Sequence, residues 1–214
     1  NHIDPNSKPV TLLLGLLKSQ NLIKKNKPGV DKARDLTRLT SNPLILNRAV
    51  EEEFIASLYE MSSRKIEEAK DARYGNGTCS LDFNLFTDNR DIVKTVAQDL
   101  KIIMMKAVKS EIYIDDSFFN ILGAGSGTTP HRHINNLDKI KGLNLDKKKY
   151  SLAYYLSEGD QKCIQPGILK LYDPSQEILP RGGMITIIPA TRRHSSDYSG
   201  GKDRVMIGVN FYSL

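Results

Sequence analysis

The chain has 214 residues, of which 39% are apolar, so it can bury the core of one good-sized domain or two small ones. This composition excludes a collagen, a disulfide-rich knot and a wholly disordered chain. No apolar run approaches the roughly 18 residues of a membrane-spanning helix, so we expect no membrane segment. The two cysteines, Cys79 and Cys163, fit neither a disulfide framework nor a CxxC motif, which favours a reducing, cytoplasmic setting.

The net charge of +6 is concentrated at the N-terminal end. Residues 1–40 hold eight Lys or Arg and three Asp, so they carry +5 of the total charge and the rest of the chain carries +1. We therefore interpret residues 1–40 as a basic arm or linker, the end of a longer protein, and residues 41–214 as the main domain. The arm has no Phe, Tyr or Trp that could stack on bases, which argues against a nucleic-acid partner.

Two helices are predicted before the main run of strands. Ser41-Asn42-Pro43 has the capping side chain and the first-position proline of a helix start, and an apolar stripe follows over 43–72. A second stripe predicts a helix over 91–109, and the alternation over 79–86 predicts a strand between the two. The stripes consist of Val50, Phe54, Leu58 and Met61, and of Val93, Val96, Leu100, Ile103 and Ala107.

After residue 110 the sequence changes to short extended segments separated by Gly, Pro and Asp, the pattern of an antiparallel sandwich or barrel. We expect strands over 117–122, 131–135, 151–156, 168–172, 184–188 and 204–212. Helices followed by strands indicate an α+β fold in which the helices buttress one sheet. The glycines at 123–127 lead into a strand and not into a helix, so they predict a turn and not a phosphate-binding loop.

Three of the four histidines lie in two short clusters, His131-x-His133 and the later Arg192-Arg193-His194. Side chains at i and i+2 of a strand point to the same face, so His131 and His133 should emerge side by side. Two imidazoles from one strand and a third from a later strand form a site that suits Fe, Cu, Ni or Zn. An HxH pair taken alone is a weak signal and favours a structural or surface role; the rest of the pattern points to a metal.

The last predicted strand carries an unusual polar face. Alternation places Arg204, Met206, Gly208 and Asn210 on one face, opposite an apolar face that forms the core contact. A cation directed into a barrel predicts a bound anion, because the planar guanidinium matches a carboxylate with two parallel hydrogen bonds. The alternative is that Arg204 pairs with Asp203 or faces solvent.

A series of motifs over residues 75–214 resembles the Fe(II)- and 2-oxoglutarate-dependent dioxygenases, particularly their prolyl-hydroxylase-like branch. In chain order they are Gly125, Pro130-His131-x-His133, Tyr154-Tyr155-Leu156, Pro166-Gly167-Ile168-Leu169, His194 and Arg204. The resemblance implies a double-stranded β-helix, a jelly roll or cupin-like fold, backed by the N-terminal helices. It also implies that His131 and His194 bind Fe(II), and that Arg204 and Tyr155 bind the far carboxylate of 2-oxoglutarate.

The chain departs from the family at one position, since His133 stands where the family has an acidic residue. Three interpretations stay open. His133 itself binds the metal, as in the three-histidine sites of cupin-type dioxygenases; or Asp138 from the following loop supplies a carboxylate; or iron is held weakly or not at all. Three neutral imidazoles would leave Fe(II) with its full +2 charge, which strengthens the attraction for anionic ligands.

The function implied by the resemblance is that of an oxygenase. It would consume 2-oxoglutarate and O2, release succinate and CO2 and hydroxylate an unidentified substrate, and it needs no side-chain acid or base beyond the metal ligands. The alternatives are a three-histidine cupin-like dioxygenase that does not use 2-oxoglutarate, and a non-catalytic jelly-roll module that binds an anion or a partner protein. Lysines in loop 136–149, together with Arg192 and Arg193, favour an acidic substrate at the mouth, which loop 158–165 should also line.

Overall fold

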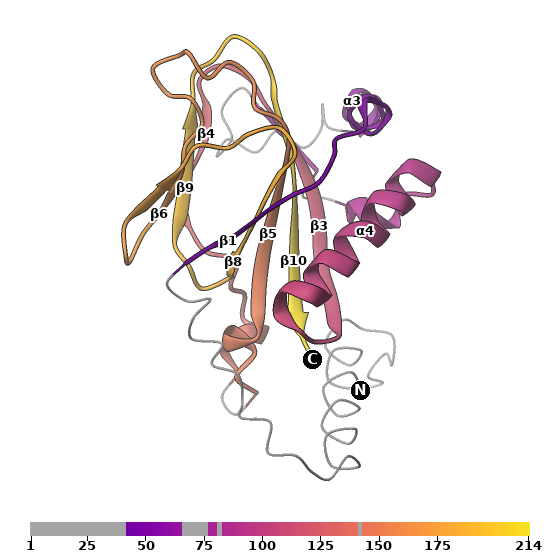
Figure 1. The fold of residues 1–214 in the computed structure, drawn as a ribbon, viewed down its shortest axis with the longest axis vertical. Coiled ribbons are helices and arrows are strands. Elements are labelled where there is room, and N and C mark those ends of the chain that lie inside the picture. The colour runs from indigo at the N-terminus through magenta and orange to yellow at the C-terminus, as the bar shows by residue number, and fades with distance from the viewer. Residues whose placement is uncertain (1–41, 66–76, 81–82, 141–142) are drawn as a thin grey trace.

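The computed structural model describes residues 42–65, 77–80, 83–140 and 143–214, so the basic arm predicted over 1–40 lies outside the described residues. Within these ranges two antiparallel sheets, of six and four strands, face each other as a jelly roll (Figure 1). Helices α3 and α4 cover the outer face of the larger sheet. The predicted α+β jelly roll backed by helices is therefore confirmed. No helix in the described ranges is both long enough and apolar enough to cross a membrane.

The strands of each sheet come from distant parts of the chain. The larger sheet contains β1 (Leu44–Asn47), β8 (Met184–Pro189), β5 (Lys149–Ser157), β10 (Arg204–Ser213), β3 (Ile112–Leu122) and β2 (Thr78–Cys79), in that order. The smaller sheet contains β4 (Ser126–His131), β9 (His194–Tyr198), β6 (Leu169–Leu171) and β7 (Gln176–Ile178), in that order. The helical elements are α3 (Glu52–Lys65), α4 (Asp91–Val108) and the short 3-10 turns η2 (Leu85–Thr87), η3 (Leu137–Lys139) and η4 (Leu145–Lys147).

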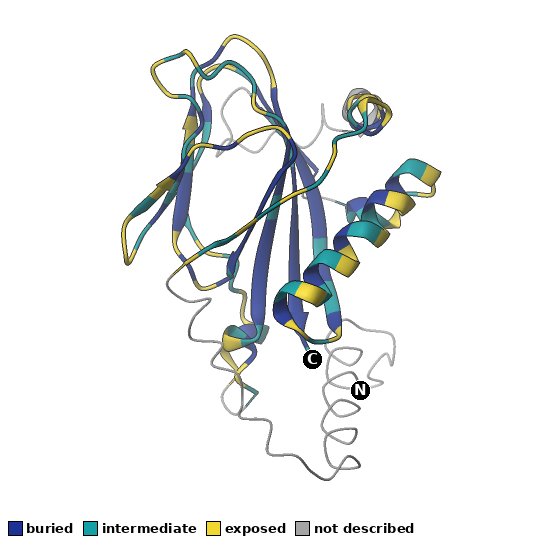
Figure 2. Cartoon of the chain, in the orientation of Figure 1, coloured by how far each residue is buried: buried dark blue, intermediate teal, exposed yellow. Residues whose placement is uncertain are grey.

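Helix α4 packs against the larger sheet with one apolar face, and Figure 2 shows its buried residues turned toward the strands. This confirms the helix predicted over 91–109, because a period of 3.6 residues places these side chains in one stripe. The helix ends at Lys109, whose left-handed φ of 53° stops the chain from continuing as a helix. The buried residues of α4 are Val93, Val96, Leu100, Met104 and Val108.

The helix predicted over 43–72 is wrong at its start. Residues 44–47 form β1, and α3 begins only at Glu52; residues 66–72 lie outside the described residues. Leu44 and Leu46 pack against the core while Ile45 is 47% exposed, which is the alternation of a strand. Residues 44–47 form a strand despite the local helix-start signal, because β8 supplies a row of backbone hydrogen-bond partners with which β1 pairs antiparallel.

The strand predicted over 79–86 is also largely wrong. Among the described residues of this segment only Cys79 lies in a strand, β2, and η2 follows at 85–87. The Asn84 side chain and the Ser117 hydroxyl both accept a hydrogen bond from the Phe86 N–H, at 3.3 and 2.8 Å. Short polar side chains of this kind satisfy the backbone locally, and the segment then has no need of a ladder partner.

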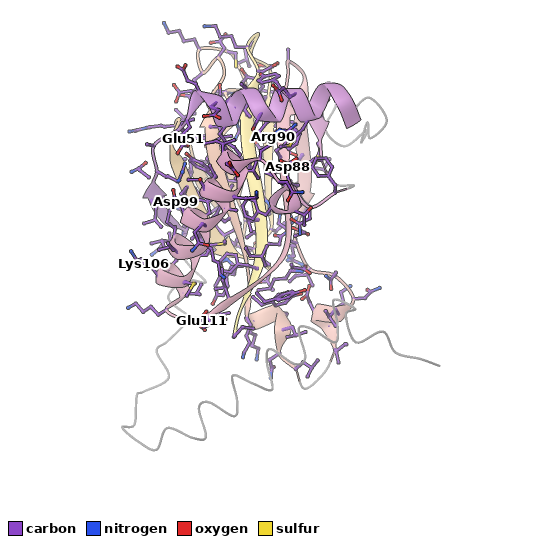
Figure 3. All side chains as sticks on the ribbon, turned by 90° about the vertical axis from the view of Figure 1, so that its right-hand side faces the viewer. Glu51, Asp88, Arg90, Asp99, Lys106 and Glu111 are labelled. Atoms are coloured by element: carbon purple, nitrogen blue, oxygen red, sulfur yellow. The ribbon has the colours of Figure 1, made fainter. Side chains whose placement is uncertain are left out.

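An ion cluster around Arg48 ties β1 to the helical layer. The guanidinium donates to Glu51 at 2.7 Å, to Asp99 on α4 at 2.8 Å and to the Tyr154 hydroxyl on β5 at 3.1 Å. Figure 3, which faces this side of the molecule, labels Glu51 and Asp99 close to one another. Burial lowers the pKa of Arg48, but its hydrogen bonds to the two carboxylates outweigh burial and raise it. The cation therefore holds the turn after β1 on both the helix and the sheet.

We predict that Gly208→Ala lowers the free energy of unfolding by about 1–3 kcal/mol, because the added methyl group overpacks the space between two paired strands. A Cβ at Gly208 would lie 2.4 Å from Cζ of Phe118 on β3. Urea denaturation measures the change. Gly201→Ala is the control, since nothing lies within 4 Å of a Cβ there, and it should stay within about 0.5 kcal/mol of the wild type. Equal stability of the two variants would contradict the close contact between Gly208 and the Phe118 ring.

Candidate functional site

The three predicted histidines meet at the end of the smaller sheet. His131 ends β4, His194 begins β9, and the two residues are directly paired in the ladder. The strand predicted over 131–135 is therefore wrong in its bounds, since the strand ends where it was expected to begin. The chain continues past it, and the His133 N–H donates to the Ala190 carbonyl at 3.0 Å. One ring nitrogen of each histidine lies within 4.8 Å of the others, a spacing that could hold a metal ion.

Backbone carbonyls orient two of the three imidazoles. His131 Nδ1 lies 2.7 Å from the Thr129 carbonyl, and His194 Nδ1 lies 3.0 Å from the Arg192 carbonyl. Because a carbonyl only accepts hydrogen bonds, Nδ1 of each ring carries the proton and Nε2 keeps a free lone pair. This is the tautomer in which a histidine binds a metal through Nε2.

The third imidazole is held less firmly, by a side-chain network. Asn210 Nδ2 lies 3.5 Å from His133 Nδ1, at the limit of a hydrogen bond. The amide is itself oriented, because Ser151 donates to its oxygen at 2.6 Å and its nitrogen donates to Asp116 at 2.8 Å. The polar face of β10 thus reaches the histidine cluster through Asn210.

The environment keeps His133 and His194 neutral. Burial, with a smaller contribution from the positive charges of His194, His131 and Lys149, lowers the pKa of His133 to about 3. Burial likewise lowers the pKa of His194 to about 4, against the hydrogen bond to the Arg192 carbonyl, which raises it. At pH 7 both rings are therefore in the uncharged form that binds a metal.

Asp138, the alternative to His133, lies in a different cluster. Its carboxylate accepts hydrogen bonds from Lys149 at 3.0 Å, from the Tyr212 hydroxyl at 2.6 Å and from the Asn135 N–H at 2.8 Å. Lys149 is only 2% exposed and also pairs with Asp115 at 2.9 Å. Asp138 thus compensates a buried ammonium, and it is not one of the three residues whose ligand atoms meet.

A cavity of about 70 Å³ runs from the histidines between the two sheets to Arg204. Its lining confirms the predicted faces of two strands. β10 contributes Arg204, Met206, Gly208 and Asn210, and β5 contributes Ser151, Ala153 and Tyr155. Leu152 and Val209, which alternate with these residues and belong to the main core, also border the cavity, whereas Ile207 and Tyr154 pack into the main core. Apolar walls come from Phe118, Leu122, Leu169 and Ile188.

Arg204 is a buried cation without a counter-ion. Its side chain is 1% exposed, Nη1 donates to the Ser196 hydroxyl at 2.8 Å, and Nε has no hydrogen-bond partner in the described chain. Its guanidinium lies 5.1 Å from the centre of the Tyr155 ring. Asp203 does not pair with it and instead accepts a hydrogen bond from Tyr59 at 2.8 Å, so the alternative of a surface ion pair is wrong. Burial lowers the pKa of Arg204, and the two tyrosines Tyr155 and Tyr198 partly oppose this.

Three further residues shape this end of the cavity and were not predicted as site residues. Ser196 fixes one nitrogen of Arg204, and Thr186 forms a hydrogen bond with Tyr155. Gly167 has a φ of +78°, and a Cβ there would lie 2.5 Å from Nη1 of Arg204. The sequence does contain a signal for Ser196, because it stands two residues from His194 and so shares its face of the strand.

A scan against protein-family models finds no match to this chain, and a comparison with curated protein sequences finds none either. Solved structures do match. A prolyl hydroxylase from Trichoplax adhaerens, in complex with a fragment of the hypoxia inducible factor oxygen degradation domain, superposes with a TM-score of 0.62 at 14% identity, over 99% of this chain and 96% of its own.

Two other solved structures show the same likeness. An oxidoreductase of the 2OG-Fe(II) oxygenase family from Burkholderia pseudomallei gives a TM-score of 0.54 at 13% identity, over 87% of this chain and 92% of its own. HygX from Streptomyces hygroscopicus, with nickel and 2-oxoglutarate bound, gives 0.57 at 10% identity, over 85% and 87%. The chain therefore has the fold of the 2OG-Fe(II) oxygenases. The resemblance seen in the sequence, including the prolyl hydroxylases, is confirmed at the level of the fold.

We predict that the metal-free protein loses stability as the pH falls from 7 to 4. In this window the unfolded chain protonates its histidines near pH 6.5, while His133 and His194 stay neutral in the folded state, so lower pH favours the unfolded chain. Because two groups contribute, the expected slope averages roughly 2 kcal/mol per pH unit, from urea denaturation at a series of pH values. The double variant His133→Gln/His194→Gln should flatten the curve. A curve with the same slope in the double variant would contradict the burial of neutral imidazoles.

Proposed function

We propose that the protein is a non-haem Fe(II)- and 2-oxoglutarate-dependent oxygenase that hydroxylates a substrate not yet identified. The observation that carries this proposal is the buried, uncompensated guanidinium of Arg204 in the cavity that begins at His131, His133 and His194. A metal centre and a fixed cation at opposite ends of one cavity suit a short dicarboxylate.

The donor set fits a divalent iron. His131 and His194 present Nε2 lone pairs in fixed directions, and His133 adds a third imidazole on the same side. When bound, the iron would supply the oxygen chemistry that couples decarboxylation of 2-oxoglutarate, with release of succinate and CO2, to substrate hydroxylation. Because the three ligands are neutral, the site keeps the full charge of the ion, which favours anionic ligands at the open positions.

The other end of the cavity fits the far carboxylate of 2-oxoglutarate. Arg204 has an N–H at Nε that is free within the described chain, and Ser196 orients the guanidinium by accepting a hydrogen bond from Nη1. The Tyr155 hydroxyl lies beside the same guanidinium. Ser196 stands two residues from His194 on the same strand face, about 7 Å along β9. The spacing is of the order of a five-carbon dicarboxylate, so one molecule can reach both ends.

Apolar side chains form part of the cavity wall. Phe118, Leu169 and Ile188 line the space between the histidines and Arg204 with apolar surface. Low polarity there strengthens the attraction between a carboxylate and the guanidinium. Gly167 leaves this guanidinium room where any side chain would collide with it. These residues hold and orient 2-oxoglutarate, and none is needed as a general acid or base.

The first test concerns the metal ligands. We expect His194→Ala and His133→Ala to bind less than half of the Fe(II) that the wild type binds, measured by metal analysis after anaerobic loading, because each removes an imidazole from the cluster. Asp138→Asn is the matched control and should keep about one iron per chain, since its carboxylate is already engaged by Lys149. Retention by His133→Ala with loss in Asp138→Asn would assign the third ligand to Asp138 instead.

The second test concerns the cofactor. Titration of 2-oxoglutarate into the Fe(II)-loaded protein without O2 should produce the visible charge-transfer band of a chelated 2-oxo acid. Arg204→Ala should keep the iron and weaken 2-oxoglutarate binding at least about tenfold, because a charge-assisted bidentate contact is lost. Ser199→Ala, a substitution in the turn after β9, is the control. A wild type that binds iron but gives no band would favour the three-histidine dioxygenase without 2-oxoglutarate, and a wild type without iron would favour a binding module.

A further inference from the structure

A second cavity, of about 190 Å³, lies beside the histidine cluster. We call it the arginine cavity, and it is lined by Arg132, Tyr172, Asp173, Pro189, Thr191, Arg192 and Arg193. Two of these residues adjoin the metal-site residues in sequence, since Arg132 separates His131 from His133 and Arg193 precedes His194. Neighbouring residues of an extended chain point to opposite sides, so the same two segments face the metal site with one side and this cavity with the other.

The wall of the arginine cavity is held by backbone and side-chain hydrogen bonds. The Tyr172 N–H donates to the Arg193 carbonyl at 2.9 Å, and the Tyr172 hydroxyl lies 2.9 Å from the Ser195 hydroxyl. Arg192 is 7% exposed and donates to the carbonyls of Asp173, at 2.9 Å, and Pro174. These contacts make the cavity a built feature of the turn between β8 and β9.

The cavity concentrates positive charge. Three guanidinium groups line it, against one acidic residue, Asp173. Arg132 and Arg193 are exposed and form no salt bridge within the described chain; Arg193 instead lies 5.3 Å from the centre of the Tyr172 ring. Two guanidinium groups that line one cavity without a salt bridge in the described chain attract an oxyanion, because they bind phosphate and carboxylate through paired hydrogen bonds.

We propose that the arginine cavity binds an oxyanion, a phosphate or a carboxylate, that the substrate carries. The proposal rests on the oxygenase function proposed above. The β8–β9 turn lines the arginine cavity with Thr191, Arg192 and Arg193 and leads directly into His194. A substrate that lies over this turn can therefore contact both the arginine cavity and the histidine cluster. The anionic group then holds the rest of the substrate at the metal site. The sequence predicts an acidic substrate, and the position of the arginine cavity adds that the acidic group lies close to the carbon that reacts.

Of the residues that the structure describes, none in loop 136–149 or loop 158–165 lines this cavity. Loop 158–165 packs at the opposite end of β9, where the Asp160 N–H donates to the Tyr198 hydroxyl at 2.6 Å. The prediction that this loop lies at the same mouth as Arg192 and Arg193 is therefore wrong. The positive charge beside the metal site comes instead from the residues that alternate with the histidines.

The test uses the full chain, freed of metal so that anions cannot bind to iron, and titrated with inorganic phosphate and with acetate by calorimetry at low ionic strength. We expect saturable binding that weakens about tenfold or more in Arg132→Gln/Arg193→Gln, because two charge-assisted contacts are lost. Arg181→Gln, which removes an exposed arginine outside the cavity, should bind as the wild type does. Tighter binding of phosphate than of acetate would identify a phosphorylated substrate, and the reverse a carboxylate.

Three outcomes would overturn the proposal: no anion binding in the wild type, equal binding in the wild type and the double variant, or binding that is lost in Arg204→Ala and kept in the double variant. The last would place the anion between the sheets. The readout is separate from that of the oxygenase function, which depends on the iron-dependent band of 2-oxoglutarate and on Arg204. Each proposal can therefore fail while the other stands.

Discussion

The buried guanidinium of Arg204 is the constraint around which the interior of the jelly roll is arranged. A cation removed from water without a counter-ion costs several kcal/mol unless polar groups or a bound anion compensate it. The chain supplies only the Ser196 hydroxyl and the neighbouring tyrosine, and Nε remains without a partner in the described chain. The fold tolerates this cost through the packing of two sheets and two helices, and the result is a cavity ready to receive a carboxylate.

The paired ends of β4 and β9 in the smaller sheet, with the residues next to them, contribute both to the histidine cluster and to the arginine cavity. His131, His133 and His194 meet at the metal-site cluster, while their sequence neighbours Arg132 and Arg193 line the arginine cavity, as expected where consecutive residues of an extended chain alternate in direction. Pairing of His131 with His194 brings the two segments together and so assembles both sites at once. The histidine cluster and the arginine cavity are thereby linked, and a change in this ladder would disturb both.

The likeness to solved oxygenases persists at 10–14% identity, which physical reasoning accounts for. Core positions require only an apolar side chain of suitable volume, so the residue type there can change while the strand pairing is kept. The polar groups inside the cavity are far more restricted, because each needs a partner. His133 is therefore informative: it stands where the family that the sequence resembles has an acidic residue, and it is also the imidazole that the surroundings hold least firmly.

Sequence patterns alone determined the features that depend on local periodicity: the helix at 91–108, the polar faces of β5 and β10, and a turn before β4, which the structure places at 124–125. The candidate site residues His131, His133, His194, Tyr155 and Arg204 came from the motifs and their resemblance to a family. The patterns misassigned β1 as helix and missed β9, because both strands exist through pairing with distant segments: β1 pairs with β8, and β9 pairs with β4 and β6. Only the tertiary structure decided that Asp138 serves Lys149 while His133 stands with the other histidines, and that Arg204 is buried without a carboxylate. These outcomes depend on contacts between residues far apart in the sequence. Periodicity predicts the face of the strand or helix on which a side chain lies, but not the residues that the side chain contacts.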